Sequence, residues 1–376
     1  MPQVVLIVLN NFKNDSRVLK EAISLQKKGY NVKVVGLWEP GLREEEIVSG
    51  VPVHRMKLFT KNWPKNKLIQ LIKYLEFSIK FVSTYRKADI FHCNDLETLP
   101  IGVFIKRFFN KKAKIVYDAH EYETEIAGLS GIQKKLTKFL EKILINYSEA
   151  IITVSESIAN EYKRIYNIRK PHVILNVPNY CKINTQEDLL RKELEIKEGK
   201  KIFLYQGGLS SGRGIELILD AFGKVEDNRA VVVFMGYGPL KKLIEERAKK
   251  NKNIYFLPAV PPEKVLNYTA SANYGISLIE NICLSYYYCL PNKLFEYIMA
   301  EIPVIVSNLP EQREIVEKYN IGFVVKDFSV EELVKIIEKA LDSDKESFRK
   351  SLKKAKKVFN WEKEEEKLWK IYYDLK

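Results

Sequence analysis

The chain has 376 residues, of which 46% are hydrophobic, and its 62 Lys and Arg outnumber its 48 Asp and Glu to give a net charge of +14. A chain of this length exceeds what one hydrophobic core usually supports, so we expect two domains. The longest apolar runs, such as residues 4–9 and 231–235, have the length of strands and exclude a membrane-spanning helix, which needs roughly 20 apolar residues.

The positive charge is concentrated in the first half of the chain. Residues 1–186 carry 30 Lys and Arg against 18 Asp and Glu, a net charge of +12, whereas residues 187–376 carry 32 against 30. Nucleic acid and an anionic membrane leaflet are the two partners that such a surface favours. We expect no nucleic-acid partner, because no RNA-binding aromatic motif, zinc finger or basic zipper accompanies the charge.

The four cysteines are widely spaced, which is typical of free thiols rather than of a zinc site or a disulfide framework. The first apolar run begins at residue 4 with no secretory signal before it, so we expect a cytoplasmic protein, with association at the inner face of the membrane as a further option.

Short apolar runs alternate with helical stretches along both halves of the chain. They lie at residues 4–9, 31–37, 51–57, 89–93, 114–118, 150–154 and 172–175, and again at 201–206, 231–235, 254–257, 274–279, 304–307 and 322–325. Such strands predict an α/β protein with two doubly wound, Rossmann-like domains facing across a cleft. The predicted parts are a first domain at 1–176, a linker at 177–200, a second domain at 201–346, and a helical segment at 347–376 that returns toward the first domain.

Residues 67–87 predict a helix with a broad apolar face. Polar residues such as Gln70, Lys73 and Lys80 recur every three or four positions between apolar ones. Two interpretations stay open. Either the helix packs on a sheet and exposes only its lysines, or it contacts a membrane or a lipid-linked substrate.

Polar residues follow the first strands of the chain. Asp15 and Arg17 come after the first strand, where they either contact substrate or the facing domain, or serve as a helix cap and an exposed cation. Asp95 follows the strand at 89–93 and either caps the helix through residue 101 or contacts an acceptor.

The segment Tyr117-Asp118-Ala119-His120-Glu121 follows another buried strand. Since the carboxyl ends of parallel strands carry the ligands of such sheets, His120 is a candidate to hydrogen-bond a substrate or to orient the reacting centre. Asp118 and Glu121 either contact substrate or fix the loop and the start of the next helix.

A glycine-rich loop, Gln206-Gly207-Gly208-Leu209-Ser210-Ser211-Gly212-Arg213-Gly214, follows the first strand of the second half and opens a helix at Ile215. Glycines let backbone N–H groups approach a ligand closely, and the Arg213 guanidinium can bind a diphosphate through two hydrogen bonds. The alternative is a tight turn with an exposed Arg213. Gly236-Tyr237-Gly238-Pro239, after the next strand, is either a similar loop or a plain turn.

Residues 290–306, with the sequence LPNKLFEYIMAEIPVIV, predict a short helix at 293–300 with Asn292 as its cap and a buried strand after it. The free N–H groups of a helix start favour phosphate, and Lys293 adds a positive charge. Glu296 lies on the same helical face, and a carboxylate suits two ribose hydroxyls. The pattern therefore indicates a nucleoside diphosphate site.

In their order along the chain, these segments and others resemble glycosyltransferase family 4, with the GT-B fold, over nearly the whole length. The matching segments are NDSRVLKEA, FHCNDLETLP, YDAHEYETE, ITVSESI, GGLSSGRGIELILDAF, GYGP and LPNKLFEYIMAEIPVIVS. The resemblance implies a metal-independent, retaining enzyme without a cofactor. It would move a sugar from a nucleotide-diphosphate donor to a glycan, lipid-linked or other hydroxyl acceptor in surface polysaccharide or glycoconjugate synthesis.

Carried over by position, the resemblance gives a role to each candidate residue. Arg213 and Lys293 would bind the donor phosphates in the second domain, Glu296 the ribose, and His120 of the acceptor-side domain would lie beside the transferred sugar. Further donor contacts are expected from Gly207, Gly208, Pro258, Ala259, Val260, Asn292 and Leu294. Sugar or acceptor contacts are considered for Asp15, Arg17, Asp95, Asp118, Glu121 and Tyr288.

The sequence departs from the family at one position. Many members carry two glutamates separated by seven residues, and the first would fall at Tyr288, which is not acidic. Position 288 therefore does not offer the usual carboxylate to the donor sugar. Members with the N-K-L-F-E-Y form commonly lack that glutamate too, so the departure does not exclude activity. The donor is left open, with a UDP-sugar favoured. Tyr286, Tyr287 and Tyr288 either line the sugar pocket or pack among themselves.

Two alternatives to a transferase remain at this point. A sugar-nucleotide epimerase would use the same fold, because fold does not fix function, but it needs an acid and a base that flank the sugar. A non-enzymatic protein would bind an anionic surface through its basic half.

Overall fold

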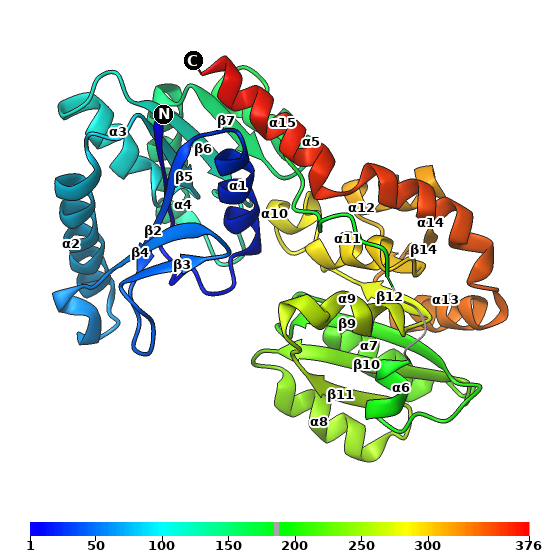
Figure 1. Cartoon of the computed structure of the whole chain (residues 1–376). Coiled ribbons are helices and arrows are strands. Elements are labelled where there is room, and N and C mark those ends of the chain that lie inside the picture. The colour runs from blue at the N-terminus through cyan, green and yellow to red at the C-terminus, as the bar shows by residue number, and fades with distance from the viewer. Residues whose placement is uncertain (184–187, 376) are drawn as a thin grey trace. The chain divides into compact units, whose positions relative to one another are not determined.

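The computed structural model describes residues 1–183 and 188–375, and it divides into two compact units. The first unit contains Met1–Ile174 and the chain from Glu364 onward, and the second contains Leu175–Lys363. Each unit has one sheet, parallel or nearly so, with helices around it (Figure 1). The predicted fold class of two Rossmann-like α/β domains is confirmed.

The sheet of the first unit has the strand order β3-β4-β2-β1-β5-β6-β7-β8. Its strands are β1 (Gln3–Ile7), β2 (Asn31–Leu37), β3 (Glu45–Val48), β4 (Val51–Met56), β5 (Ile90–Asn94), β6 (Lys114–Ala119), β7 (Ala150–Thr153) and β8 (His172–Val173). The central strands β1, β5 and β6 are almost entirely buried, as expected for parallel strands that helices cover on both faces.

The helices of the first unit connect these strands. They are α1 (Ser16–Lys27), α2 (Lys67–Tyr85), α3 (Leu99–Phe108), α4 (Gly131–Leu144) and α5 (Glu156–Tyr166), with the short 3₁₀ turns η1 (Phe59–Asn62) and η2 (Ile145–Tyr147). The C-terminal helix α15 (Trp361–Asp374) joins this unit from Glu364 onward. The Trp369 indole donates a hydrogen bond to the Ser24 carbonyl oxygen at 2.8 Å, which holds α15 against α1.

The antiparallel edge strand β3 has no counterpart in the predicted elements. It pairs with β4 through a two-residue turn in which Ser49 and Gly50 both have positive φ, at 50° and 85°. This is the geometry of a tight hairpin. A run of three glutamates at residues 44–46, two of which lie in the strand, hides it from any search for apolar segments.

The sheet of the second unit is parallel, with the strand order β11-β10-β9-β12-β13-β14. Its strands are β9 (Lys201–Gly208), β10 (Ala230–Tyr237), β11 (Ile254–Pro258), β12 (Tyr274–Ser277), β13 (Val304–Ser307) and β14 (Gly322–Val325). Its helices are α6 (Leu189–Glu193), α7 (Ile215–Lys224), α8 (Lys241–Lys250), η3 (Pro262–Lys264), α9 (Val265–Ala270), α10 (Leu284–Tyr287), α11 (Asn292–Met299), α12 (Pro310–Tyr319), α13 (Val330–Asp342) and α14 (Glu346–Val358).

The unit boundaries are drawn differently from the predicted ones. Part of the predicted linker at 177–200 lies outside the described residues, at 184–187. The rest contributes Val177, Leu190 and Ile196 to the core of the second unit, so it packs as part of that unit. The helical segment predicted at 347–376 is also divided, because α14 packs on α11 and α12 in the second unit and only the chain from Glu364 belongs to the first.

The helix predicted at residues 67–87 is α2. It buries Phe77 and Phe81, yet it exposes the apolar side chains of Leu68, Leu71, Leu75 and Ile79. The interpretation in which only its lysines face solvent is therefore wrong. Within the described part of the chain, no helix combines the length and apolar character needed to cross a membrane.

Candidate active site

The carboxyl ends of β9, β10 and β11 bring three of the predicted segments side by side. Gly207 is in register with Gly236, which in turn is in register with Pro258. Gly207 has a φ of +110°, and a Cβ on Gly236 would lie 1.9 Å from the Gly207 carbonyl oxygen. Glycine is thus required at both positions, and Gly208, Pro258 and Ala259 are exposed at the same edge.

The N-terminus of α11 lies next to this edge. A Cβ on Gly207 would meet the Cε atom of Lys293 at 3.8 Å. The helix begins at Asn292 after Pro291, so Asn292 is its first residue and not its cap, and no side chain caps the helix. Its first backbone N–H groups therefore lack a side-chain acceptor, which leaves them available to an anion. Leu294 is buried in the core of this unit.

Lys293 is the most unusual charged group in the second unit. Its side chain is buried, its Nζ has no hydrogen-bond acceptor among the described residues, and it lies 3.5 Å from the centroid of the Tyr205 ring. Burial first, and then the nearby Arg213 guanidinium, lower the pKa of Lys293 to about 7, although Glu296 acts in the opposite direction. An ammonium group held in this way is poised to accept an anionic partner.

Glu296 is held by a polar residue that sequence reasoning did not single out. Gln206 donates from Nε2 to the Glu296 carboxylate and accepts from the Thr269 hydroxyl at 2.7 Å. Gln206 directly follows the buried residues 202–205 of β9, and a polar residue at the end of such a run is the signal by which it could have been found. The Glu296 carboxylate thus has a fixed position one helical turn beyond Lys293.

Arg213 and its neighbour Tyr286 complete this group. The Arg213 guanidinium lies over the Tyr286 ring, with Cζ 4.8 Å from the ring centroid, and it is half-buried rather than fully exposed. Gly214, with φ of +71°, places Arg213 just before α7. Tyr286 is thus in contact with Arg213, while the Tyr287 and Tyr288 rings pack against each other with centroids 5.0 Å apart.

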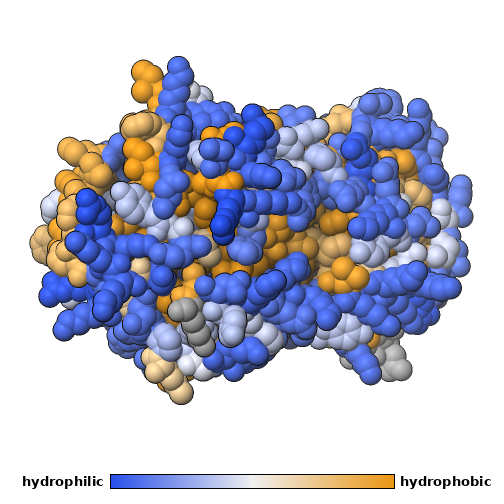
Figure 2. Space-filling model, turned by 90° about the horizontal axis from the view of Figure 1, so that it is seen from above, coloured by the Kyte–Doolittle hydropathy of each residue, from blue (hydrophilic) through white to orange (hydrophobic). Residues whose placement is uncertain are grey.

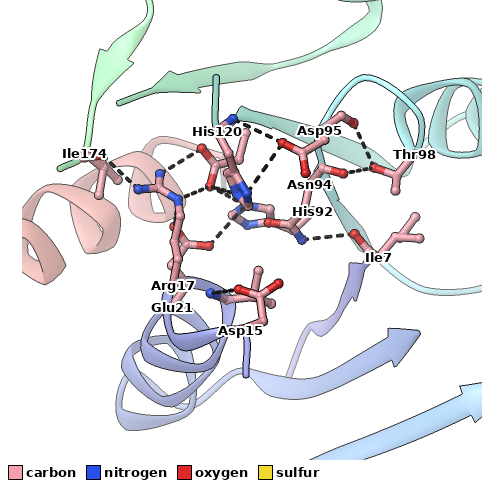
Figure 3. Close-up of polar contacts among 12 residues, drawn as sticks. Ile7, Asp15, Arg17, Glu21, His92, Asn94, Asp95, Thr98, His120 and Ile174 are labelled. Atoms are coloured by element: carbon pink, nitrogen blue, oxygen red, sulfur yellow. Dashed lines mark hydrogen bonds and ion pairs between the residues drawn. The ribbon is translucent and has the colours of Figure 1, made fainter. Parts of the chain in front are cut away.

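The first unit gathers several of its predicted polar residues around Asp118 at the end of β6, and Figure 3 labels Arg17, Asp95 and His120 among them. Arg17 donates from Nε to Asp118 Oδ2 at 2.9 Å and from Nη2 to Asp118 Oδ1 at 2.8 Å. Its Nη1 donates to the Ile174 carbonyl oxygen at 3.0 Å. Arg17 is only 3% exposed, so the expectation of an exposed cation is wrong. Burial acts to raise the pKa of Asp118, but the charge of the paired Arg17 guanidinium outweighs it and holds the pKa of this carboxyl well below its usual range.

His120 lies against this ion pair and is partly exposed. Its Nε2 is 3.1 Å from Asp118 Oδ2, and its Nδ1 is 3.5 Å from Asp95 Oδ1. Burial acts to lower the pKa of His120, but Asp118 and then Asp95 outweigh it and raise the pKa to about 9. The imidazole is therefore protonated at neutral pH and donates hydrogen bonds, so it is unsuited to act as a general base.

Three further residues contact this group and were not predicted: Glu21 of α1, His92 of β5 and Tyr372 of α15. Glu21 lies 3.2 Å from Arg17 Nε, and His92 Nε2 lies 3.6 Å from Glu21 Oε2 and 3.7 Å from Asp118 Oδ2. The other ring nitrogen of His92 is 2.8 Å from the Tyr372 hydroxyl. Burial raises the pKa of Glu21, with a second contribution from Asp118, and the Arg17 guanidinium acts in the opposite direction.

Two of the remaining candidates, Asp15 and Asp95, make hydrogen bonds to nearby backbone N–H groups. Asp15 caps α1 by accepting a hydrogen bond from the Val18 N–H at 3.2 Å. Asp95 does not cap α3, which begins after Thr98; its carboxylate turns toward His120 and accepts the His120 backbone N–H at 3.2 Å. Asp95 has a φ of 63°, a left-handed conformation that places it at this corner. Glu121 is exposed.

One set among the described residues could ligate a metal ion, namely Glu21, His92 and Asp118, whose donor atoms lie within 4.8 Å of one another. The Arg17 guanidinium already contacts both carboxylates. A divalent cation would therefore have to displace this guanidinium or accept its repulsion.

Comparisons with known proteins agree with these observations. Residues 16–177 match Glycosyltransferase Family 4, and residues 186–359 match Glycosyl transferases group 1. An uncharacterized glycosyltransferase of Methanocaldococcus jannaschii is 25% identical over 60% of this chain and 59% of its own length. The chitobiosyldiphosphodolichol beta-mannosyltransferase of Candida albicans is 22% identical over 91% of this chain and 81% of its own length.

Solved structures share the whole fold. A sucrose-phosphate synthase of Thermosynechococcus elongatus superposes with a TM-score of 0.78 at 18% identity, and covers 100% of this chain and 99% of its own. The Anabaena protein HepE, solved in complex with UDP-glucose, superposes with a TM-score of 0.77 at 14% identity and covers 100% of both chains. At these identities the likeness establishes the fold.

Proposed function

Because the chain belongs to the family 4, group 1 glycosyltransferases with the GT-B fold, we propose that it transfers a sugar, with retention, from a nucleotide-diphosphate donor to a hydroxyl group. The favoured donor is a UDP-sugar, and the acceptor is a glycan or lipid-linked molecule used in surface polysaccharide or glycoconjugate synthesis. The family consists of transferases, so the non-enzymatic alternative is set aside.

The observation that carries the proposal is the buried Lys293 ammonium beside the uncapped start of α11. A diphosphate bound there would give the Lys293 ammonium the hydrogen-bond acceptor that it lacks among the described residues. The free N–H groups at the start of α11 would bind other oxygens of the same diphosphate. Arg213 would add a second cation from the glycine-rich loop, while Glu296, fixed by Gln206, would accept the ribose hydroxyls.

In the proposed reaction, the bond between the sugar and the diphosphate breaks and negative charge grows on the leaving phosphate. Lys293, Arg213 and the start of α11 would stabilise that charge, and one such group is typically worth about 2.7–4 kcal/mol. In other transferases a metal ion stabilises the negative charge of the leaving diphosphate. Here these fixed cations would stabilise it, so we propose a metal-independent reaction. The leaving phosphate would accept the proton of the acceptor hydroxyl.

We further propose that His120 contacts the transferred sugar as a hydrogen-bond donor. Its raised pKa supports a protonated side chain, and its support by Asp118 and Asp95 gives the imidazolium a defined orientation. The enzyme is expected to act in the cytoplasm, where nucleotide sugars are available, at the inner face of the membrane where lipid-linked acceptors lie.

The test is a nucleotide-release assay after a thermal-shift screen of UDP, GDP, ADP and their sugars. We expect one nucleotide to stabilise the protein, Glu296→Ala to weaken donor binding and Arg213→Ala to lower turnover. Near wild-type behaviour of both variants would refute the site. Product analysis without an acceptor separates the epimerase alternative, because an epimerase would return an isomerised donor.

A further inference from the structure

Helix α4 presents its apolar side to solvent and its polar side to the protein. Five apolar side chains at helical spacing are exposed: Ile132 at 85%, Leu136 at 65%, Phe139 at 62%, Leu140 at 43% and Ile143 at 45%. On the inward side, the buried Glu141 carboxylate accepts hydrogen bonds from the hydroxyls of Tyr117, Tyr162 and Tyr166. An amphipathic helix on a water-soluble surface normally has the reverse orientation.

Hydrogen bonding and ion pairing fix this orientation. Tyr117 and Tyr162 donate to the same oxygen of Glu141 at 2.6 and 2.7 Å, so the acidic residue of α4 is tied to β6 and α5. Lys134 and Lys138 pair with Glu125 in the segment before the helix. Rotating α4 about its axis to bury the apolar side would remove the tyrosine hydroxyl donors from the Glu141 carboxylate. These contacts therefore keep the apolar side of α4 directed toward solvent.

The apolar surface continues onto the neighbouring helices. α4 contacts α3, and α3 contacts α2. α3 and its end expose Phe104, Phe108 and Phe109, whose rings pack against one another, and α2 exposes Leu68, Leu71, Leu75 and Ile79. Figure 2 shows hydrophobic side chains gathered among hydrophilic ones at the end of the molecule where α2 and α3 lie in Figure 1. We call the exposed apolar residues of these three helices the α2–α4 face.

The charges around the α2–α4 face identify its partner. Residues 99–112 contain four basic residues and no acidic one, and the exposed charges of α4 are lysines, because its single acid is buried. A second copy of the chain would bring two basic faces together, and like charges disfavour that contact. A bilayer with anionic lipids offers hydrocarbon for the apolar side chains and negative headgroups for the lysines.

We propose that the α2–α4 face is a membrane-docking surface for anionic bilayers, with α4 lying in the interface and its apolar side directed into the lipid. The inference extends the proposed function by naming the surface from which a lipid-linked acceptor is reached, and it rests on that function only for its biological purpose. Binding to vesicles is a property of the first unit and needs neither donor nor acceptor.

The experiment is flotation of the full chain with vesicles of phosphatidylcholine alone or mixed with phosphatidylglycerol. We expect wild type to float with the mixed vesicles and not with phosphatidylcholine alone. The double variant Leu136→Gln, Phe139→Gln should lower binding at least roughly tenfold, since it removes two inserted side chains. Its matched control is Ile47→Gln, Val358→Gln, which changes two exposed apolar residues on β3 and α14 and should bind like wild type.

A second pair of variants tests the charge. Lys135→Glu, Lys142→Glu on α4 should reduce flotation with mixed vesicles, whereas Lys350→Glu, Lys353→Glu on α14, which makes the same change in net charge, should not. Circular dichroism and thermal unfolding of each variant establish that it is folded. Equal loss from both charge variants would mean that net charge alone drives binding, and would overturn the assigned surface.

Other outcomes separate this inference from the proposed function. If wild type is stabilised by a nucleotide but does not float with anionic vesicles, the docking surface is wrong and the transferase site stands. If wild type floats with anionic vesicles but no nucleotide stabilises it, the docking surface stands and the transferase site is wrong. If wild type self-associates in solution and Leu136→Gln, Phe139→Gln makes it monomeric without any effect on lipid, the face is a protein interface and the inference fails.

Discussion

At the scale of single residues, Lys293 shows how burial prepares a binding site. Most lysines of the chain are hydrated and gain little from a phosphate beyond screened attraction. Lys293 is buried among the surrounding side chains, and this burial, together with the nearby Arg213 guanidinium, lowers its pKa to about 7. A bound diphosphate would restore the charged form, so binding is coupled to uptake of a proton.

This coupling predicts the pH dependence of nucleotide affinity. Above pH 7 the free enzyme holds Lys293 increasingly neutral, and a neutral amine must be protonated when the diphosphate binds. We expect the affinity for UDP, or whichever nucleotide the screen selects, to fall about fivefold from pH 7 to 8 and about tenfold from pH 8 to 9. Isothermal titration calorimetry in buffers of different ionisation enthalpy should report proton uptake over the same range.

The variant Lys293→Met is the control for this pH effect. It should bind the nucleotide roughly tenfold to a hundredfold more weakly, with affinity that no longer changes between pH 7 and 9. Lys249→Met, an exposed lysine on α8, should keep the wild-type profile. A wild-type affinity that is flat from pH 7 to 9 would contradict the assigned role of Lys293.

The Arg17–Asp118–His120 group gives a second prediction at this scale. The pKa of His120 is raised to about 9 from an ordinary 6.5, so the stability it contributes is complete below pH 6.5 and is lost as the pH rises toward 9. His120→Gln should flatten the decline in stability over this window, as measured by urea unfolding. NMR titration of wild type should place the His120 pKa well above 6.5; a value at or below 6.5 would refute the assigned environment.

The sequence predicted some members of the Arg17–Asp118–His120 group, but not the contacts that connect them to one another and to the rest of the fold. Asp118 and His120 were predicted from their place after a buried strand, and both lie at that edge. Arg17 and Asp118 are separated by 101 positions, and His92 and Tyr372 by 280. No local pattern links such residues, because only strand order and the return of α15 bring them together. Glu21, His92 and Tyr372 could not be found without the fold.

At the scale of elements, the contact between β9 and β10 controls the shape of the glycine-rich edge. The backbone of Gly207 passes so close to Gly236 that a side chain at Gly236 would overlap the Gly207 carbonyl. We therefore expect Gly236→Ala to push the two strand ends apart, to destabilise the protein by about 1–3 kcal/mol, and to weaken nucleotide binding. Urea unfolding and the nucleotide-release assay measure the two effects.

A second glycine in the same unit provides the matched control. Gly223 lies within α7, and a Cβ there would meet nothing within 4 Å. Gly223→Ala should leave nucleotide binding unchanged and raise stability by up to about 1 kcal/mol, because alanine favours the helix. If Gly236→Ala behaves like Gly223→Ala, the close strand approach does not matter for the site.

Helix α4 illustrates what a hydrophobic pattern cannot decide. The apolar residues of α4 recur at helical spacing, but this spacing does not state which side of the helix faces the protein. The inward side is fixed by three tyrosine hydroxyls from β6 and α5 that converge on Glu141, and these contacts join residues more than 20 positions apart. Long apolar strands were predicted well because their burial requires no such partner, whereas the glutamate-rich β3 was missed.

At the scale of the whole molecule, the two halves of the sequence differ in charge, and the two units differ in the groups that they carry. The basic excess falls in residues 1–186, which also contain His120 and the α2–α4 face, while Arg213, Lys293 and Glu296 all lie in the second unit. The division of labour predicted from sequence, with donor binding assigned to the second domain, remains a proposal. It can be tested without any knowledge of the acceptor.

Hydrogen exchange with and without nucleotide tests this division directly. A ligand at 100 times its dissociation constant stabilises the unit that binds it by about 2.7 kcal/mol, which slows exchange through unfolding of that unit roughly a hundredfold. We expect this protection in the core strands β9, β10 and β13, and local protection in the loop before α7 and at the start of α11. The core strands β1, β5 and β6 of the first unit should exchange at unchanged rates. Protection confined to the first unit, or none in β9 and β10 at saturating nucleotide, would contradict the placement of the donor site.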